Sequence, residues 1–406
     1  MWVPSLYIAE GIPYTIVNVL SAILFKLKGM ENDMITLYTV WMSLPWTIKP
    51  LWSPLVEMIK TSKFWVITCQ LTIGGALASI GLTIESDSWL IYCMTGLWLV
   101  AFMSATHDIA ADGYYIEALD TRQQSMWVGI RSTFYKIATL MGQGGIVMLA
   151  GYLEKQHGVD YAWKISFLML AALMLIFGVY HMMAMGDTGK DGSETNAKRS
   201  IGKLLKTYFC KSHIGLILAF LLLYRLGESQ LSKIAPLFLL DSTEKGGLGL
   251  STENLGIING TFGLTAMIAG GIAGGVLISR QGLHKWLIPM ILALNVPDVF
   301  YAIMSEYQIQ NLPAITAMVS IEQSGYGFGF AAYSVFMLQI SKGRYNTAHY
   351  SISTAFMALG FMLPGMASGY IQTQLGYTGF FVWVLACCVP SIIVAVIAKR
   401  RNLCLQ

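Results

Sequence analysis

The sequence predicts an all-α membrane protein with about twelve transmembrane helices in two pseudo-symmetric six-helix bundles. Of its 406 residues, 55% are hydrophobic and only 12% are charged, against about 25% charged in a typical soluble domain. Apolar runs of about 20 residues, the length that crosses a bilayer, recur along the whole chain. Because so little charge is available to cover a water-facing surface, most of the exterior should face lipid.

Each expected helix follows from one apolar run. The first six are expected at 3–25, 35–57, 64–84, 89–116, 127–151 and 163–185, and the second six at 213–240, 253–279, 286–305, 312–340, 347–372 and 378–398. These runs are too long for transmembrane β-strands and lack their alternating polarity. The polar stretch GDTGKDGSETNAKRS interrupts the pattern. We therefore expect an N-terminal bundle at 1–185, a flexible cytoplasmic linker at 186–212 and a C-terminal bundle at 213–406.

Lysine and arginine indicate the orientation. With both termini cytoplasmic, sixteen of these residues fall in cytoplasmic segments and only four, Lys26, Lys28, Lys155 and Lys245, fall on the opposite side. Such a bias is typical of membrane proteins. The net charge of +4 is therefore a topology signal and not a nucleic-acid footprint. The first run begins almost at Met1, so a trimmed or late-started N-terminus is expected.

Two pairs of acidic residues indicate an internal repeat. Glu10 and Glu228 are 218 residues apart, and Asp108 and Glu322 are 214 residues apart. Similar offsets favour a duplicated six-helix unit.

The most informative residues are ionisable side chains inside the expected helices. A charge at the centre of a bilayer costs at least about 2.5–3.5 kcal/mol and has to face a partner or a water-filled cavity. The eleven such residues are Glu10, Lys49, Asp108, Asp112, Arg131, Lys136, Arg225, Glu228, Lys233, Asp298 and Glu322. That is too many for a passive membrane anchor.

The expected helix at 89–116 carries the densest set. Asp108 and Asp112 are four residues apart and share one face of the helix. Two interpretations stay open. In one, Asp108 is a proton-coupling or gating acid, because a carboxylate in a cavity that is wet only at times can carry a proton near neutral pH. In the other, the two acids are static partners of the bases Arg131 and Lys136 on the next helix.

The second half repeats this chemistry. Arg225 and Glu228 are three residues apart, close enough to pair on one helix face. Glu322 precedes Gly325, Gly327 and Gly329. No strand precedes this glycine series, so it predicts close helix packing and not a dinucleotide site.

The sequence lacks the motifs that usually identify ATP-driven pumps, metalloproteases and serine hydrolases. The sequence contains no G-x-x-x-x-G-K-[ST], no H-E-x-x-H and no G-x-S-x-G. Its six cysteines show no C-x-x-C spacing, so neither disulfides nor a metal site are expected. We expect no cofactor and no enzymatic activity. Energy would have to come from an ion gradient or from the gradient of a solute.

Four stretches resemble the anhydromuropeptide permeases (AmpG) of the major facilitator superfamily. They are KPLWSPLVEMI at 49–59, SATHDIAADGYY at 104–115, LYRLGES at 223–229 and GGVLISRQGLHK at 274–285. The resemblance extends over nearly the whole chain and implies the major facilitator fold. It also implies the import of N-acetylglucosaminyl-anhydro-N-acetylmuramyl peptides from periplasm to cytoplasm by alternating access, driven by the proton motive force.

The resemblance further implies roles for individual residues. The expected substrate-binding or coupling residues are Lys49, His107, Asp108, Tyr115, Lys136, Arg225, Glu228 and Glu322, and the expected gating residues are Glu57, Asp112, Arg131, Arg280 and Lys285. His107 stands where the family has Gln, and Tyr115 stands where it has a basic residue. These departures leave the choice of substrate open.

We therefore expect a proton-coupled importer of an anionic sugar-peptide. Carriers of siderophores, acetyl-coenzyme A or drugs are alternatives within the same superfamily, and a non-transporting receptor on the same scaffold is an alternative from another class. The expected partners are the solute, protons and membrane lipid, without nucleic acid. The expected state is a monomer that crosses the bacterial inner membrane several times, with both termini cytoplasmic.

Overall fold

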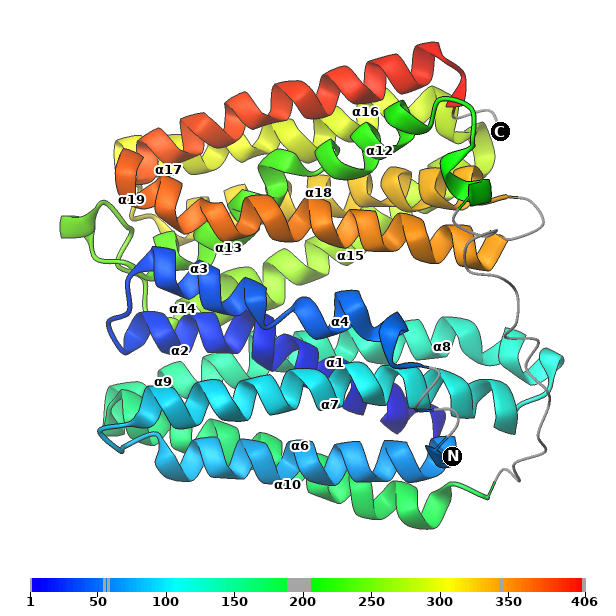
Figure 1. Ribbon diagram of the computed structural model, residues 1–406. Helices are drawn as coiled ribbons and strands as arrows, with labels where there is room; N and C mark the ends of the chain where they lie inside the picture. Colours follow the sequence, from blue (N-terminus) through cyan, green and yellow to red (C-terminus); the bar gives the residue numbers. More distant parts are fainter. Residues whose placement is uncertain (1, 54–55, 57–58, 188–205, 343–345, 404–406) are drawn as a thin grey trace. The chain divides into compact units, whose positions relative to one another are not determined.

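The computed structural model describes residues 2–53, 56, 59–187, 206–342 and 346–403. Over these residues the chain is helical and forms no strand (Figure 1). The described part is therefore all-α, as the sequence predicts.

In the N-terminal part of the chain, the described segments up to the end of α7 are six α-helices, the π-helical segment η1 and the 3-10 turn η2, and four further segments follow, among them the π-helical η3. Their bounds are α1 Val3–Thr15, η1 Ile16–Leu20, α2 Ser21–Leu27, α3 Asn32–Trp41, α4 Leu44–Ile48, η2 Lys49–Leu51, α6 Ser62–Thr83, α7 Trp89–Ala118, α8 Thr121–Leu140, η3 Met141–Ile146, α9 Val147–His157 and α10 Val159–Ala184.

The remaining segments belong to the C-terminal part of the chain. Their bounds are α12 Ile214–Leu223, α13 Leu226–Leu240, η4 Thr243–Lys245, α14 Thr252–Leu255, η5 Gly256–Gly263, α15 Leu264–Gln281, α16 Leu283–Asn295, η6 Val296–Asp298, α17 Val299–Tyr307, α18 Leu312–Ile340 and α19 Asn346–Arg400.

Most expected helices coincide with these segments. Helix α18 spans the predicted 312–340, and α6, α7 and α10 each lie within a few residues of their predicted bounds. The expected helices at 347–372 and 378–398 are both contained in α19, where Gly376 has a φ of +67° and breaks the helical backbone between them. Glycine tolerates this left-handed conformation because it lacks a Cβ.

Several expected helices are interrupted. The run at 35–57 begins as α3, α4 and η2, with a proline at the start of both later segments, and part of its end lies outside the described residues. The run at 213–240 is divided into α12 and α13 at Tyr224 and Arg225. Proline lacks an amide hydrogen, so Pro45 and Pro50 suit the starts of α4 and η2, whereas no proline lies at the break between α12 and α13.

Eight helical stretches among the described residues are long and apolar enough to cross a membrane. One of them, His349–Arg400, contains two of the expected helices. The expected helix at 35–57 is not among the eight because turns divide its described residues into short segments, and the expected helices at 127–151 and 312–340 are helical but also not among the eight. The chain is therefore a multi-pass membrane protein, and these three stretches contain several of the ionisable residues.

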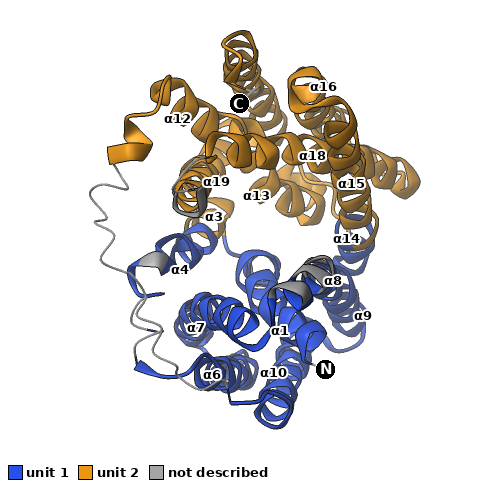
Figure 2. Cartoon of the chain, turned by 90° about the vertical axis from the view of Figure 1, so that its right-hand side faces the viewer, with its two compact units in different colours: residues 1–30, 38–193, 251–260 blue, residues 31–37, 194–250, 261–406 orange. Residues whose placement is uncertain are grey.

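The chain divides into two compact units, coloured separately in Figure 2. Unit 1 comprises residues 1–30, 38–193 and 251–260, and unit 2 comprises residues 31–37, 194–250 and 261–406. Much of the expected linker at 186–212 lies outside the described residues, so a boundary there stays a prediction.

Unit 1 is held together by close helix packing. Helices α6, α7 and α10 lie side by side (Figure 1). A methyl group added at Gly74 of α6 would lie 2.7 Å from Leu175 Cγ, and one added at Gly178 of α10 would lie 2.7 Å from Leu71 Cδ2. Small residues at these crossings let the helices approach, which compensates for the weak hydrophobic drive between helices in lipid.

Unit 2 uses the glycine series of α18 in the same way. Gly327 faces the Met267 carbonyl of α15, and Gly325 faces the Ala293 carbonyl of α16. The predicted role of these glycines in close packing is confirmed. Their contacts hold α15, α16 and α18 together and leave Glu322 at the centre of this group, only 2% exposed.

The substitution Gly327→Ala should destabilise the protein, because the new methyl group would overlap the Met267 carbonyl. Overpacking of this kind costs about 1–3 kcal/mol, so the thermal unfolding midpoint of the purified protein should fall by several degrees. Gly275→Ala on α15 is the control, since nothing lies within 4 Å of the added methyl group. Equal midpoints for the two variants would contradict the packing role.

Candidate functional site

Two partly exposed ion pairs link helices of unit 1, with 15% of the Asp108 side chain and 48% of the Asp112 side chain accessible. Lys49 Nζ, at the start of η2, donates to Asp108 Oδ2 of α7 at 3.3 Å. One helical turn further along α7, Asp112 Oδ1 lies 2.9 Å from Arg131 Nη2 of α8 and accepts a hydrogen bond of 3.2 Å from the Tyr7 hydroxyl of α1. The expectation that Asp112 pairs with Arg131 is confirmed, whereas Asp108 pairs with Lys49 and not with Lys136.

Aromatic rings surround the Arg131 guanidinium. Its central carbon lies 4.7 Å from the centre of the Tyr7 ring and 5.1 Å from that of Tyr115. The Tyr115 hydroxyl donates to the Gln124 carbonyl. Cation–π contacts strengthen when they are shielded from water, so these rings stabilise the charge of Arg131 while Asp112 neutralises it.

Glu10 adds a third carboxylate to this cluster. It lies within electrostatic reach of Asp108, Asp112, Arg131 and Lys49. Its Oε2 atom is buried and has no hydrogen-bond partner among the described residues. The cluster therefore holds three carboxylates and two cations, so it carries one acidic group more than its bases can neutralise.

His107 points away from this cluster and into a separate hydrogen-bonded chain. Gln70 of α6 lies between two histidines: its Nε2 is 2.9 Å from His107 Nε2, and its Oε1 is 2.9 Å from His181 Nδ1 of α10. His181 Nε2 lies 2.9 Å from the Ser5 hydroxyl of α1. This chain ties four helices together.

The amide of Gln70 fixes the protonation of His107. An amide nitrogen can only donate, so His107 Nε2 accepts and the ring proton lies on Nδ1. That atom is buried without a partner among the described residues. His107 is thus a neutral packing residue in this conformation, and its assignment to substrate binding or coupling stays a prediction.

Unit 2 contains a corresponding pair at a break in its first helix. Arg225 follows α12 and precedes α13, and its Nε donates to Glu228 Oε2 at 2.7 Å. The predicted i,i+3 pairing is confirmed. Arg225 Nη2 also donates to the Tyr326 hydroxyl at 3.1 Å, and the guanidinium lies 5.1 Å from the Phe330 ring centre and 4.8 Å from that of Phe361.

Two further carboxylates of unit 2 lie near this pair. Asp298, at the end of η6, is 1% exposed, and Glu322 of α18 is 2% exposed. They lie within electrostatic reach of each other and of Glu228. Glu322 accepts a 3.0 Å hydrogen bond from Gln323, while Asp298 Oδ1 has no partner among the described residues.

The bases near these three carboxylates are Arg225 and Lys233, and both lie within electrostatic reach of Glu228. Neither Asp298 nor Glu322 forms an ion pair within the described part of the chain. Unit 2 therefore repeats the composition of the cluster in unit 1, with three carboxylates and two cations.

The remaining expected residues lie elsewhere. Lys136 of α8 is exposed, and so are Arg280 and Lys285, which flank the turn between α15 and α16. Glu57 lies outside the described residues. The gating roles of Arg280, Lys285 and Glu57 stay predictions.

The sequence did not single out Gln70, His181 or Asp298 as site residues. A polar residue inside an apolar helix is a usable signal of a functional site, and all three residues have it. Asp298 is one of the eleven intramembrane charges that the sequence shows. Which helix faces which cannot be read from the spacing within one helix, so these partnerships needed the tertiary structure.

No protein-family model matches the chain. Its sequence is similar to the anhydromuropeptide permease of Escherichia coli K12, with 23% identity over 87% of this chain and 70% of that protein. It is also similar to the transporter named AmpG 4 of Rickettsia conorii, with 24% identity over 95% of this chain and 93% of that protein.

Solved structures of transporters share the fold. A D-xylose-proton symporter matches 97% of this chain and 95% of its own, with a TM-score of 0.73 and 10% identity. A bacterial homologue of the human lysosomal transporter Spinster matches 99% of this chain and 96% of its own, with a TM-score of 0.71 and 15% identity. The chain therefore has the major facilitator fold and is AmpG-like in sequence.

His107→Gln should preserve stability and His107→Leu should reduce it. Glutamine can still accept from Gln70, whereas leucine leaves that buried amide without its acceptor, at a cost of about 1–3 kcal/mol. The thermal midpoint of the purified protein checks both variants. Gln70→Leu, which removes a partner from both histidines, should lower the midpoint further. If the leucine variant is as stable as the glutamine variant, this chain of hydrogen bonds does not contribute to the stability of the protein.

Proposed function

We propose that this AmpG-like major facilitator imports anhydro-muropeptides from periplasm to cytoplasm together with protons, for the recycling of cell-wall material. In this proposal it resides in the bacterial inner membrane with both termini in the cytoplasm. The import is by alternating access, and the two acidic clusters carry the protons.

The proposal rests on the one carboxylate in each cluster that exceeds the number of cations. Burying an ionised carboxylate without a cation is far more costly than burying its neutral form. Glu10, Asp108 and Asp112 share two cations, and so do Glu228, Asp298 and Glu322. At least one carboxyl group in each cluster therefore binds a proton while it is dry, and releases it when the cluster opens to water.

The ion pairs provide the exchange that coupling needs. When Asp108 binds a proton, Lys49 loses its partner and becomes free to meet an anionic group of the solute. Arg225 can do the same in unit 2 when Glu228 is protonated. Protonation and binding of an anionic solute then favour one another. Protonation of the carboxylate frees the cation for the solute, and a solute that pairs with the cation leaves the carboxylate without its partner, which favours protonation.

The substrate class is supported by the chemistry of the residues and by the names of the relatives. The peptide carboxylates of a muropeptide suit Arg225, Lys49 and the exposed Lys136. Aromatic side chains beside these bases, such as Tyr326 and Phe361 at Arg225, suit sugar rings. The relative from Escherichia coli is named anhydromuropeptide permease, and one fold neighbour is a proton symporter.

Two alternatives make different predictions. A carrier of another solute, such as a siderophore or drug, would transport that solute without competition from muropeptide. A non-transporting receptor would bind its ligand without flux, and its ion pairs would stay fixed. Competition assays separate the first alternative, and a flux assay separates the second.

Purified protein in proteoliposomes should accumulate labelled muropeptide when an inward-directed pH gradient is imposed. A gradient of one pH unit supports up to about tenfold accumulation for each coupled proton. A protonophore should abolish the accumulation. Equal uptake in its presence would refute proton coupling, and uptake that no muropeptide can compete for would refute the substrate.

Asp298→Asn and Glu322→Gln should each abolish the accumulation of muropeptide driven by a pH gradient, because the neutral amide cannot exchange a proton. Exchange of labelled for unlabelled muropeptide should persist, since it needs no net proton movement. Glu85→Gln is the control: this carboxylate is half exposed, with 53% of its side-chain surface accessible, and pairs with Lys164. Loss of exchange together with accumulation would indicate a structural role for the two acids.

A further inference from the structure

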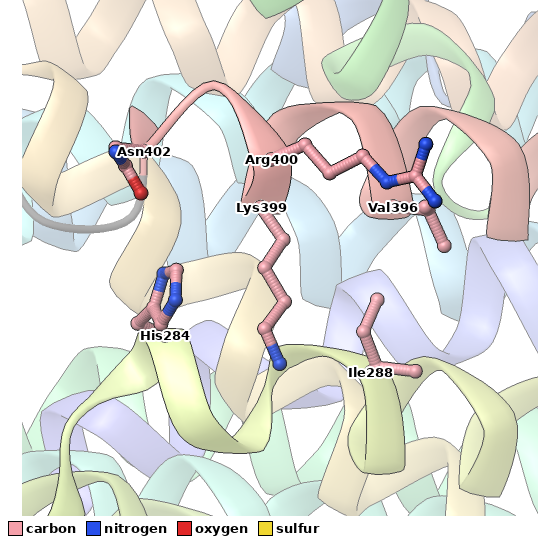
Figure 3. Close-up of a pocket in the computed structure, with 6 residues that line it drawn as sticks. All are labelled: His284, Ile288, Val396, Lys399, Arg400 and Asn402. Atoms are coloured by element: carbon pink, nitrogen blue, oxygen red, sulfur yellow. The ribbon is translucent and has the colours of Figure 1, made fainter.

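We propose that the cleft between the start of α16 and the end of α19 binds the phosphate headgroup of an anionic membrane phospholipid. The cleft has a volume of about 380 Å³ and lies within unit 2. Its lining consists of His284, Ile288, Val396, Lys399, Arg400 and Asn402 (Figure 3).

The polar lining of this cleft is basic. Lys399 extends from α19 toward α16 in Figure 3, and His284 lies on the facing helix. No acidic residue lines the cleft, and neither Lys399 nor Arg400 has an ion-pair partner among the described residues. His284 Nδ1 is buried and also lacks a described partner. An anion in the cleft would give Lys399 the partner that it lacks.

The start of α16 adds to this preference for an anion. The helix begins at Leu283 after Gly282, which has a φ of +80°, and no side chain caps its first amide groups. A helix of 13 residues with free N-terminal amides favours a negative charge at that end. The helix terminus and the basic side chains therefore select the same kind of ligand.

An apolar surface continues from the cleft along both helices. Ile288 and Val396 form its apolar walls. Ile393 and Ile397 of α19 are 50% and 41% exposed, and Leu292 of α16 is 40% exposed. Ile393, Ile397 and Arg400 follow one another at intervals of four and three residues, so they share one face of α19. Acyl chains can lie on this face while the phosphate meets the bases, which favours a lipid over a free phosphate ion.

Other bases at helix ends behave differently. Lys63 pairs with Asp187 at 3.0 Å, and Lys211 donates to the Ile340 carbonyl. Lysine and arginine at the ends of transmembrane helices usually extend into water. Lys399 instead points into a cleft that offers it no anionic partner, which is the geometry of a headgroup site.

The test is a titration of the purified full-length chain in detergent with phosphatidylglycerol, followed by native mass spectrometry. The double variant Lys399→Gln/Arg400→Gln should bind phosphatidylglycerol about 25-fold more weakly, since each base near an anionic lipid contributes about fivefold. Ile288→Trp should also weaken binding, by filling the cleft without changing its charge. Lys60→Gln/Lys206→Gln removes two exposed bases elsewhere and should leave the affinity unchanged.

Titrations with other ligands identify what the cleft binds. Phosphatidylcholine should bind weakly to the unaltered protein, and inorganic phosphate at millimolar concentration should not displace phosphatidylglycerol. Full displacement by phosphate would overturn the lipid assignment in favour of a free anion. Equal losses in the cleft variant and the Lys60/Lys206 control would show that only net charge matters and would overturn the site. Thermal midpoints of all variants verify that each one is folded.

Discussion

The cost of burying charge in an apolar interior is the constraint on which the rest of this structure depends. Each unit contains one cluster of three carboxylates and two cations between its helices. Asp112 with Arg131, and Arg225 with Glu228, are paired, hydrogen-bonded and flanked by aromatic rings. The remaining acids have fewer partners. They can persist in a dry interior as neutral acids, which makes the same residues suited to exchanging protons.

Interruptions of the helices place these charges. Lys49 begins η2, Arg225 lies between α12 and α13, and Asp298 ends η6. At such breaks the backbone departs from the regular helix, so a side chain can turn toward its neighbours inside the unit. Discontinuous helices at binding sites are a common feature of transporters. The glycine contacts of α18 let the surrounding helices pack closely.

The charged residues at the helix ends have different surroundings from those in the interior. Asp108 and Glu322 are confined among other side chains, so their charge depends on a few neighbours and on access of water. Lys399 and Arg400 lie where α19 ends, beside apolar surface that suits lipid. In our proposals, the interior charges couple transport to protons, and the charges at the end of α19 bind an anionic lipid.

The sequence by itself determined the all-α membrane class, the helical segments and the pairing of Arg225 with Glu228, because apolar length and i,i+3 spacing are local properties. It also identified the AmpG-like stretches. Tertiary structure decided that Asp108 pairs with Lys49, that His107 turns toward Gln70, and that Asp298 lies near Glu322. Those partners come from different helices, and the rotation and depth of each helix are set by packing between helices, which no spacing within one helix encodes.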